Sequence, residues 1–491
     1  MGVKKWFTTL PEFGIQGGKK LRGVYLNKAI GFVAGAGFMF GYDQGVMSSL
    51  LTLEEFERQF PTATPYTPSD PVCQDPTQCT GTPALQSNMV SIYQIGCLLG
   101  AILILFVGDA LGRRVSTFWG TAIIIAGTII QAAANSYGLL CFSRIFTGIG
   151  NGMVTSTIPT WQSECAKPKD RGYLIMNEGM LIGFGIMISY WIDYGFYHTT
   201  GEIRWRFPVA FQAFFALVVI SGILVLPDSP RWLLKKNYVE EARDVIARLN
   251  GVDVDSEQVA EDIAILEHTL ALETERFSWR EFWRHGRVQH FRRMLLGVIA
   301  QAMQQYCGIN LITYYATILF ERSLGFDASM SRLLAAVNGT EYWLSAVVAM
   351  FCVERFGRRR LMFVGLVGMM CSMAVLAGCI SSGGRDAEGN IVLAEAEGDV
   401  ATLTLFTFNT FFAIGFLGMT WLYPAEINPL RTRMAQKMPK LEGAALEREL
   451  ARYFDDGSSA EGSQQDMEKS APPATSSASD EKVEAPLSDT K

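Results

Sequence analysis

Two residues of opposite charge, Asp43 and Arg144, lie inside long apolar stretches of this sequence. On insertion scales a charge at the centre of a membrane helix costs roughly 2.5–3.5 kcal/mol, so it needs a partner or a purpose. At about 1.5 Å per residue, Asp43 lies roughly 21 Å from one membrane surface and Arg144 roughly 9 Å from the other. They therefore reach the same depth in a core about 30 Å thick. A carboxylate that alternates between an arginine and a proton is a physical basis for proton coupling, and a permanent structural ion pair is the alternative.

A second group of polar residues follows one helix face. Gln301, Gln304 and Gln305 are spaced i, i+3 and i+4, so they lie side by side on a helix. Gly308 permits a break in that helix, which would turn Asn310 toward the same cavity. Each amide both donates and accepts hydrogen bonds, so this stripe suits a ligand with many hydroxyl groups. Hydrogen bonding between helices is the alternative.

Three further residues belong to the predicted substrate site, namely Asn338, Trp421 and Glu178. Asn338 begins a glycosylation sequon, but the interior of a predicted span is inaccessible to that modification, so we interpret it as a second cavity amide. Trp421 offers an aromatic platform for the C–H face of a sugar, with a place in the interfacial aromatic belt as the alternative. Glu178 and Glu341 are intramembrane carboxylates, and each is a candidate for a second proton site or for a hydrogen-bonded packing group.

The elements that must carry these side chains are apolar helices. Apolar residues make up 49% of the chain and charged residues only 18%, which is too little polar surface for a soluble protein of this length. A membrane helix needs about 20 predominantly apolar residues, and stretches of that length without any Asp, Glu, Lys or Arg recur along the chain. We therefore predict an all-α integral membrane fold with about ten transmembrane helices. The predicted spans are 29–51, 84–107, 115–135, 137–161, 173–195, 206–226, 293–319, 331–353, 361–382 and 401–424.

Basic residues in the short loops predict the orientation of the chain. They gather in the loops after the second, fourth and eighth spans, whereas loops 52–83 and 383–399 are mostly acidic. The N-terminus is therefore predicted to be cytoplasmic, and the first 28 residues lack the apolar core of a signal peptide. We expect a multi-pass protein of the plasma membrane.

The domain organisation follows from these spans. Residues 227–290, between the sixth and seventh predicted spans, form a charged insert. Within it, residues 239–249 and 259–273 have apolar side chains at helical spacing, which predicts two amphipathic helices packed on the inner mouth of the helical bundle. The predicted parts are a cytoplasmic tail (1–28), a six-helix bundle (29–226), a cytoplasmic helical insert (227–290), a shortened four-helix bundle (291–425) and a largely disordered cytoplasmic tail (426–491).

An internal repeat indicates two similar halves. GDALGRR (108–114) recurs as ERFGRRR (354–360), and IPTWQSE (158–164) is echoed by WLYPAE (421–426). Each pair places acids and arginines at matching cytoplasmic span ends. These residues are predicted to form a cytoplasmic gate network, which bridges the two halves when the carrier is open to the outside. The tendency of basic residues to lie on the cytoplasmic side explains some of the arginines, but it does not explain the interleaved acids. The network consists of Asp109, Arg113, Arg114, Glu164, Arg171, Asp228, Arg231, Glu354, Arg358, Arg359, Glu426 and Arg431.

Several classes of function are excluded by what surrounds these motifs. All four histidines lie outside the predicted spans, so a histidine proton relay is excluded. The sequence contains neither a nucleophile constellation nor a metal cluster, and we expect no enzyme activity, cofactor or metal. A formal net charge of −6 gives no indication of nucleic-acid binding. Cys73 and Cys79 share the first long loop; if that loop faces the outside, they are candidates for a disulfide, and two cysteines alone leave open whether they pair.

The motifs together resemble the sugar porters of the major facilitator superfamily, and particularly their fungal sugar and glycerol proton symporters. The matching strings run from GYDQG (41–45) through PDSPRW (227–232) and QQYCGIN (304–310) to WLYPAE (421–426). The resemblance implies a carrier for a monosaccharide or polyol that works by proton-coupled alternating access. It also implies that Asp43 and Arg144 take part in proton coupling, and that Gln304, Gln305, Asn310, Asn338 and Trp421 contact the substrate.

Two departures from the family pattern qualify this expectation. Hexose carriers have a sugar-binding glutamine eight residues after the arginine of an Arg-Gly pair. That arginine is Arg171 here, and the chain has Gly179 in place of the glutamine. Hexose, pentose and glycerol therefore all stay open as substrates. The family also has twelve spans, so we expect the last two to be missing. A non-transporting truncated remnant and a nutrient sensor on the same fold are the alternatives.

Overall fold

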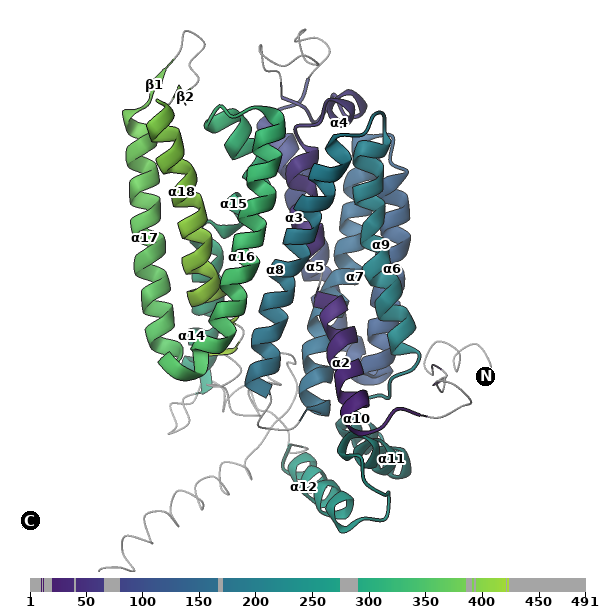
Figure 1. Ribbon diagram of the computed structural model, residues 1–491. Helices are drawn as coiled ribbons and strands as arrows, with labels where there is room; N and C mark the ends of the chain where they lie inside the picture. The colour runs from purple at the N-terminus through teal and green to yellow at the C-terminus, as the bar shows by residue number, and fades with distance from the viewer. Residues whose placement is uncertain are drawn as a thin grey trace, which may run out of the picture.

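The computed structural model consists of two bundles of long helices that stand side by side, with a group of short helices at one end (Figure 1). The bundle of residues 23–223 is called the N half and that of residues 290–423 the C half. The short helix α4 (Glu54–Gln59) marks one end of the molecule, the α4 end, and the helical insert marks the opposite, insert end. The structure describes residues 10, 12, 20–38, 41–65, 80–166, 171–273, 290–385, 391–392, 394–420 and 422–423.

The N half contains the first six predicted spans. The first of them is described in two segments, one ending at Phe38 and the next beginning at Gly41, because residues 39–40 lie outside the described residues. Its helices are α2 (Gly23–Phe38), α3 (Gly41–Leu50), α5 (Pro83–Leu111), α6 (Arg113–Ala132), α7 (Tyr137–Cys165), α8 (Arg171–Tyr197) and α9 (Ile203–Ile223).

The C half contains the other four predicted spans. Gly308 has a φ of +91°, a left-handed conformation that glycine adopts freely, and it separates α14 from α15. The predicted break at Gly308 is therefore confirmed. The elements of this half are α14 (His290–Tyr306), α15 (Ile309–Ile318), the π-helix η1 (Leu319–Ser323), α16 (Ala328–Phe356), α17 (Arg358–Ser382), the antiparallel pair β1 (Gly384–Arg385) and β2 (Ile391–Val392), α18 (Glu395–Phe412) and the π-helix η2 (Ala413–Leu417).

Among the described residues, eight helical segments are long and apolar enough to cross a membrane, with α2 and α3 counted as one. Two predicted spans fall outside this group for visible reasons. Helix α7 is long but carries Arg144 and many hydroxyl and amide side chains. The seventh span is divided at Gly308 into α14 and α15, each shorter than a complete membrane crossing.

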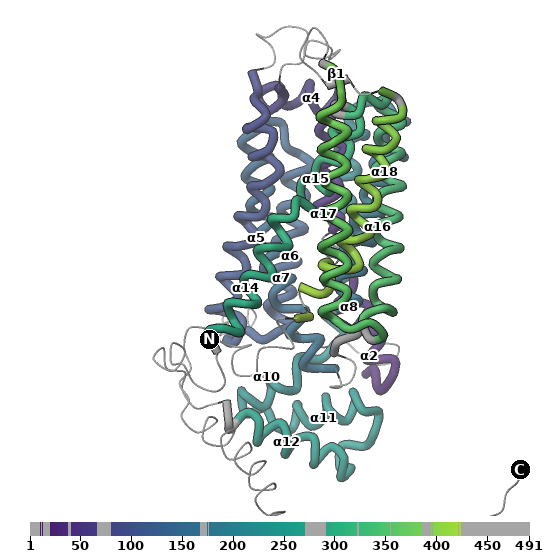
Figure 2. The backbone as a smooth tube through the Cα atoms, turned by 90° about the vertical axis from the view of Figure 1, so that its left-hand side faces the viewer, coloured from purple at the N-terminus to yellow at the C-terminus, as the bar shows by residue number. Residues whose placement is uncertain are grey.

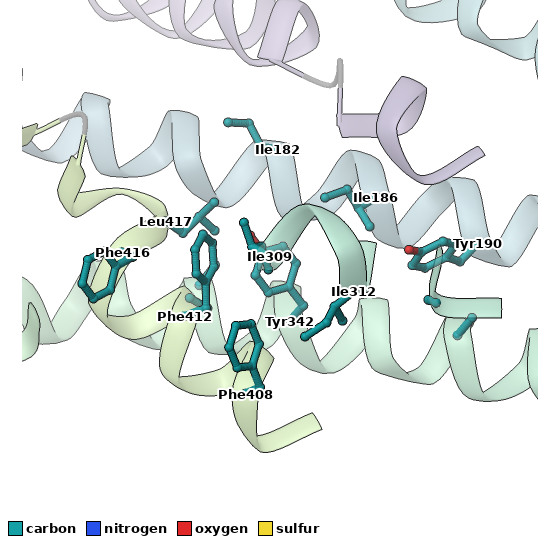
Figure 3. Packing of buried hydrophobic residues seen from close by; sticks show 14 of the residues in the cluster. Ile182, Ile186, Tyr190, Ile309, Ile312, Tyr342, Phe408, Phe412, Phe416 and Leu417 are labelled. Carbon is teal, nitrogen blue, oxygen red and sulfur yellow. The ribbon is translucent and has the colours of Figure 1, made fainter. Parts of the chain in front are cut away.

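The two halves meet along α8 and α16, and α3 of the N half packs against α15 of the C half. Figure 3 shows Ile182 and Ile186 of α8 facing Ile309 and Ile312 of α15, with Phe412 of α18 close by. This apolar cluster fills the middle of the interface. The polar side chains that also reach the interface must therefore find partners among a few neighbours.

The insert contains the two predicted amphipathic helices, α11 (Val239–Asn250) and α12 (Glu257–Glu273), and one short helix that was not predicted, α10 (Pro230–Lys235). The three lie together beyond the ends of the bundle (Figure 2). Apolar side chains of α11 and α12, such as Val245 and Val259, pack with Ile30 of α2 and Ile223 of α9. The predicted docking on the bundle is thus confirmed for the N half. Cys73, Cys79 and the C-terminal tail lie outside the described residues.

Glycine contacts hold α5 and α7 together, and they allow a test of this packing. A Cβ atom at Gly152 would lie 2.0 Å from the backbone oxygen of Cys97, whereas one at Gly138, on the same helix, would meet nothing within 4 Å. We expect Gly152→Ala to lower the free energy of unfolding by about 1–3 kcal/mol, because the two helices must separate. Gly138→Ala should leave thermal unfolding in detergent unchanged, and equal melting temperatures for the two variants would contradict the described packing.

Candidate functional site

Asp43, Tyr93 and Arg144 form a buried group inside the N half. Asp43 lies on α3, the second described segment of the first predicted span. The Tyr93 hydroxyl, from α5, donates to Asp43 Oδ2 at 3.2 Å. The Arg144 guanidinium, from α7, lies over the Tyr93 ring, 4.8 Å from its centroid, and donates from Nη2 to the carbonyl of Val90 at 3.2 Å. All three side chains are buried.

The expected direct pairing of Asp43 with Arg144 is not present in this structure. The two residues lie around one tyrosine instead, since the Tyr93 hydroxyl engages the acid while its ring lies under the guanidinium. Among the described residues, Asp43 Oδ1 and Arg144 Nε and Nη1 have no hydrogen-bond partner. Both charged groups therefore keep unused bonding capacity, which a permanent structural ion pair would not leave.

A small cavity of about 30 Å³, lined mostly by apolar side chains but also by several polar ones, lies beside Asp43. Its polar lining includes Thr121 of α6, Asn151 of α7 and Gln212 of α9. Gln212 is buried, and neither of its amide atoms has a hydrogen-bond partner among the described residues. Since a cavity needs roughly 10–15 Å³ to hold one water molecule, this one has room for about two, and its lining offers the polar partners that ordered water requires.

Three of the predicted substrate amides are engaged within the C half. Gln301 donates to the carbonyl of Thr420 at 2.8 Å, and the buried Gln304 donates to the carbonyl of Phe416 at 3.3 Å. Buried Asn338 of α16 accepts at 3.1 Å from Asn409 of α18. These contacts are the hydrogen bonds between helices that the sequence left open as an alternative role.

Gln305 and Asn310 form a separate pair on the two sides of the Gly308 break. Asn310 Nδ2 donates to Gln305 Oε1 at 2.6 Å, and Gln305 is exposed at the surface of the described chain. The break therefore turns Asn310 toward the Gln305 amide of α14 at an exposed position, and the predicted cavity shared by these amides stays a prediction. Trp421 lies outside the described residues.

Gly179 marks a close contact between the two halves. A Cβ atom at this position of α8 would lie 3.2 Å from the Cα of Gly418 in the C half. A longer side chain therefore does not fit here without movement of one half. The neighbouring Glu178 is buried and has an interaction partner.

At the insert end, a network of charged residues ties three helices of the N half to α10. Arg113 binds Glu164 of α7 through two hydrogen bonds of 2.9 Å, and its Nη1 donates to Asp109 of α5 at 3.1 Å. Asp109 also accepts from Lys235 of α10 at 2.7 Å. Arg114 donates to the carbonyl of Ile223 at the end of α9.

Asp228 closes this network by capping α6. Its two carboxylate oxygens accept from the backbone N–H groups of Arg113, at 3.1 Å, and Arg114, at 3.4 Å. Burial raises the pKa of the Asp228 carboxyl above its usual range, although the N–H of Ser229 and both arginines act in the opposite direction. A carboxylate at a helix N-terminus also stabilises that helix by its charge.

The other predicted members of the network are described only in part. Arg231 and Arg358 have interaction partners, and Arg359 is exposed. The side chains of Arg171 and Glu354, and the whole of Glu426 and Arg431, lie outside the described residues. The bridging of the halves by this network accordingly stays a prediction.

At the α4 end, a polar seal of five residues that the sequence did not single out joins the two halves. Ser49 of α3 shares a hydrogen bond of 3.1 Å with the Thr317 hydroxyl of α15, and the backbone N–H of Thr317 donates to Ser48 at 3.2 Å. Arg332 of α16 donates to the backbone and the hydroxyl oxygens of Thr52, at 2.9 and 2.8 Å. The only sequence signal for this seal was one arginine near the start of a predicted span.

Comparisons with known proteins agree on one family. The family described as "Sugar (and other) transporter" matches residues 29–438. The major facilitator superfamily transporter mfsA of Aspergillus fumigatus is 36% identical over 419 residues, which cover 84% of this chain and 74% of that protein. The sugar transporter STL1 of Saccharomyces cerevisiae is 33% identical over 434 residues, which cover 87% of this chain and 72% of that protein.

Solved structures share the fold. The xylose transporter XylE from E. coli, in a partially occluded inward-open conformation, aligns with a TM-score of 0.66 and 22% identity, covering 84% of this chain and 88% of that one. A second structure, described as the proton:xylose symporter XylE bound to 6-bromo-6-deoxy-D-glucose, aligns with the same TM-score and 23% identity, covering 84% of each chain. The two-bundle arrangement of Figure 1 is therefore the major facilitator fold.

The Tyr93 hydroxyl gives a direct test of the buried group. Tyr93→Phe keeps the ring under Arg144 but removes the donor to Asp43, so we expect it to lower the free energy of unfolding by about 1–3 kcal/mol near neutral pH. Tyr137→Phe is the matched control, because its hydroxyl donates to the carbonyl of Leu85 at an exposed position. Thermal unfolding in detergent measures both, and equal stability of the two variants would contradict the described role of Tyr93.

Proposed function

The chain belongs to the sugar transporter family of the major facilitator superfamily, and from that premise we propose that it takes up a monosaccharide or polyol together with a proton. The observation that carries this proposal is the buried carboxyl of Asp43, which has one hydrogen-bond donor, an arginine across the same tyrosine and a small cavity with several polar lining residues beside it. Such a group can exchange its partners without unfolding its surroundings.

In the proposed cycle, the Asp43 carboxyl takes a proton in one state and is attracted as a carboxylate to Arg144 in the other. A proton and a nearby guanidinium are alternative ways to compensate one buried carboxylate, so binding of either disfavours the other. Tyr93 holds both groups at a fixed spacing and keeps the carboxyl accessible to exchange. Water in the cavity lined by Gln212 and Asn151 supplies or accepts the proton.

The conformational step is the rocking of one half against the other. Opening of the α4 end requires the Ser49–Thr317 and Arg332–Thr52 contacts to break. We propose that the acid and arginine network at the insert end then closes the opposite side. The same proposal places the insert and the N-terminus in the cytoplasm, and the carrier in the plasma membrane.

The proposed substrate is a hexose, a pentose or glycerol. Gln305 and Asn310 are the first contacts, because they bind each other across the Gly308 break and a hydroxyl group can replace either partner. Gln301, Gln304, Asn338, Trp421 and Glu178 remain proposed secondary contacts. Gly179 stands where hexose carriers have a glutamine, and its contact with Gly418 leaves little room for one, which favours a small substrate.

Uptake by transporter-null cells tests the proposed coupling. We expect accumulation of at least one of labelled glycerol, glucose and xylose, and its loss on addition of a protonophore. Asp43→Asn should abolish accumulation but spare exchange across the membrane, because the neutral amide cannot release a proton. Asp399→Asn, which changes an exposed carboxyl, is the control and should accumulate normally. Protonophore-insensitive accumulation, or accumulation by Asp43→Asn, would sink the coupling proposal.

Replacement of Asn310 tests the proposed substrate contact. We expect Asn310→Ala to raise the KM for uptake about tenfold, which corresponds to one lost hydrogen bond of about 1.4 kcal/mol. The control is Asn250→Ala, since Asn250 of α11 binds Asp262 far from the bundle interface. An unchanged KM in Asn310→Ala, with normal surface expression, would remove Asn310 from the site.

A further inference from the structure

A second carboxyl group, that of Asp193, is buried between the two halves near the α4 end. It belongs to α8, only 4% of its surface is exposed, and neither of its oxygens has a hydrogen-bond partner among the described residues. The sequence analysis did not single it out, because it stands alone in the otherwise apolar string SYWIDYGF. A buried carboxyl group without partners needs an explanation.

The donors around Asp193 are engaged mainly with other groups, although Arg332 Nε has no hydrogen-bond partner among the described residues. The Ser49 hydroxyl, which lies beside the carboxyl, is engaged with Thr317. Arg332 interacts with Asp193 only through its charge, since its Nη1 donates to the carbonyl of Ala328 at 2.8 Å and its Nη2 to Thr52. The guanidinium also lies 4.4 Å from the Tyr197 ring and within 3.5 Å of Glu321.

The other titratable groups that face this carboxyl are tyrosines whose hydroxyls are turned to backbone carbonyls. Tyr42 of α3 donates to the carbonyl of Pro208 at 2.9 Å, and Tyr190 of α8 donates to the carbonyl of Thr313 of α15. Within the described residues, the Asp193 oxygens thus have no hydrogen bond of good geometry, and the nearby Ser49 hydroxyl, which is shared with Thr317, compensates the carboxylate only in part.

From this geometry we propose that Asp193 is a second proton-binding group, which has to carry a proton before the two halves can close at the α4 end. A carboxylate sealed away from water, with only a shared hydroxyl nearby and no direct ion pair, is strongly disfavoured, whereas the neutral acid avoids that cost. When the halves separate at the α4 end, water reaches the carboxyl, which then releases the proton. The step is a plain protonation, with water as donor and acceptor.

This inference rests on the proposed alternating access, but it concerns a different step from the one assigned to Asp43. Asp43 exchanges its proton inside the N half, whereas Asp193 lies at the interface that opens and closes. Closure of the α4 end then becomes easier as the pH falls. A proton bound at Asp193 acts as a condition for closure, whether or not Asp43 couples transport to protons.

The test follows the opening of the α4 end rather than transport. Ser48 is fully buried in the polar seal, so a cysteine in its place reacts with a hydrophilic maleimide only when the halves separate there. The Ser48→Cys protein is reconstituted in nanodiscs, where both sides are accessible. Labelling of the parent chain, which has its own cysteines, is subtracted first. The remaining labelling rate is then divided by that of Thr200→Cys, a cysteine at an exposed position, to remove the pH dependence of the thiol itself.

We expect the relative labelling rate to rise at least about tenfold between about pH 5 and about pH 8, because the ionised carboxyl opposes closure. Asp193→Asn, which keeps the shape of the neutral acid, should label slowly at both pH values. If the Asp193→Asn variant does not fold, the Asp193→Ser variant is tested in its place.

Glu341→Gln is the matched control, since Glu341 is also an intramembrane carboxyl with one unpartnered oxygen, but its Oε1 is bound by Ser345 and Thr410 within the C half. It should keep the full pH dependence. A pH dependence that survives in Asp193→Asn would overturn the inference. Uptake that proves insensitive to protonophores would remove the proposed coupling at Asp43 and leave the labelling result to decide on Asp193.

Discussion

A charge buried between these helices has to be compensated by a hydrogen bond, by an opposite charge or, for a carboxylate, by a proton. The rest of the structure depends on which of these partners each buried charge has. Arg144 is held by a backbone carbonyl and an aromatic face, and Arg332 by Thr52 and a second aromatic face. Asp43 has a single donor, and Asp193 has none among the described residues. The arginines are thus fixed in place, whereas the two acids retain the capacity to bind a proton.

The positions of these two acids divide the work of the carrier. Asp43 lies beside a small cavity within the N half, so in the proposed cycle its protonation changes without movement of the C half. Asp193 lies beside the seal that joins α3 to α15, so in the proposed cycle its protonation is linked to the separation of the halves. At the insert end, by contrast, Lys235 of α10 binds Asp109 of α5, and this contact ties the insert to the N half.

The sequence predicted those features that depend on local pattern. Apolar length determined the spans, helical spacing identified α11 and α12, and Gly308 was correctly expected to break its helix because only its own backbone freedom was involved. Features that depend on the meeting of distant helices were not predictable. Tyr93 separates Asp43 from Arg144, and this arrangement depends on how α3, α5 and α7 pack rather than on depth in the membrane.

The same reason explains the amides and the second acid. Gln301 and Gln304 donate to carbonyls near η2, more than a hundred residues away, and no spacing rule identifies such acceptors. Asp193 is a single letter within an apolar string, and only the structure shows that it lies between the halves without a donor.

The central claim is that substrate moves together with a proton bound by a buried carboxyl. The most direct measurement records the pH of a weakly buffered suspension of cells that express the chain, while glycerol, glucose or xylose is added. The account predicts that the medium becomes more alkaline on addition of a transported substrate, and that this change is absent in Asp43→Asn. Uptake of labelled substrate with no change in the pH of the medium would contradict it.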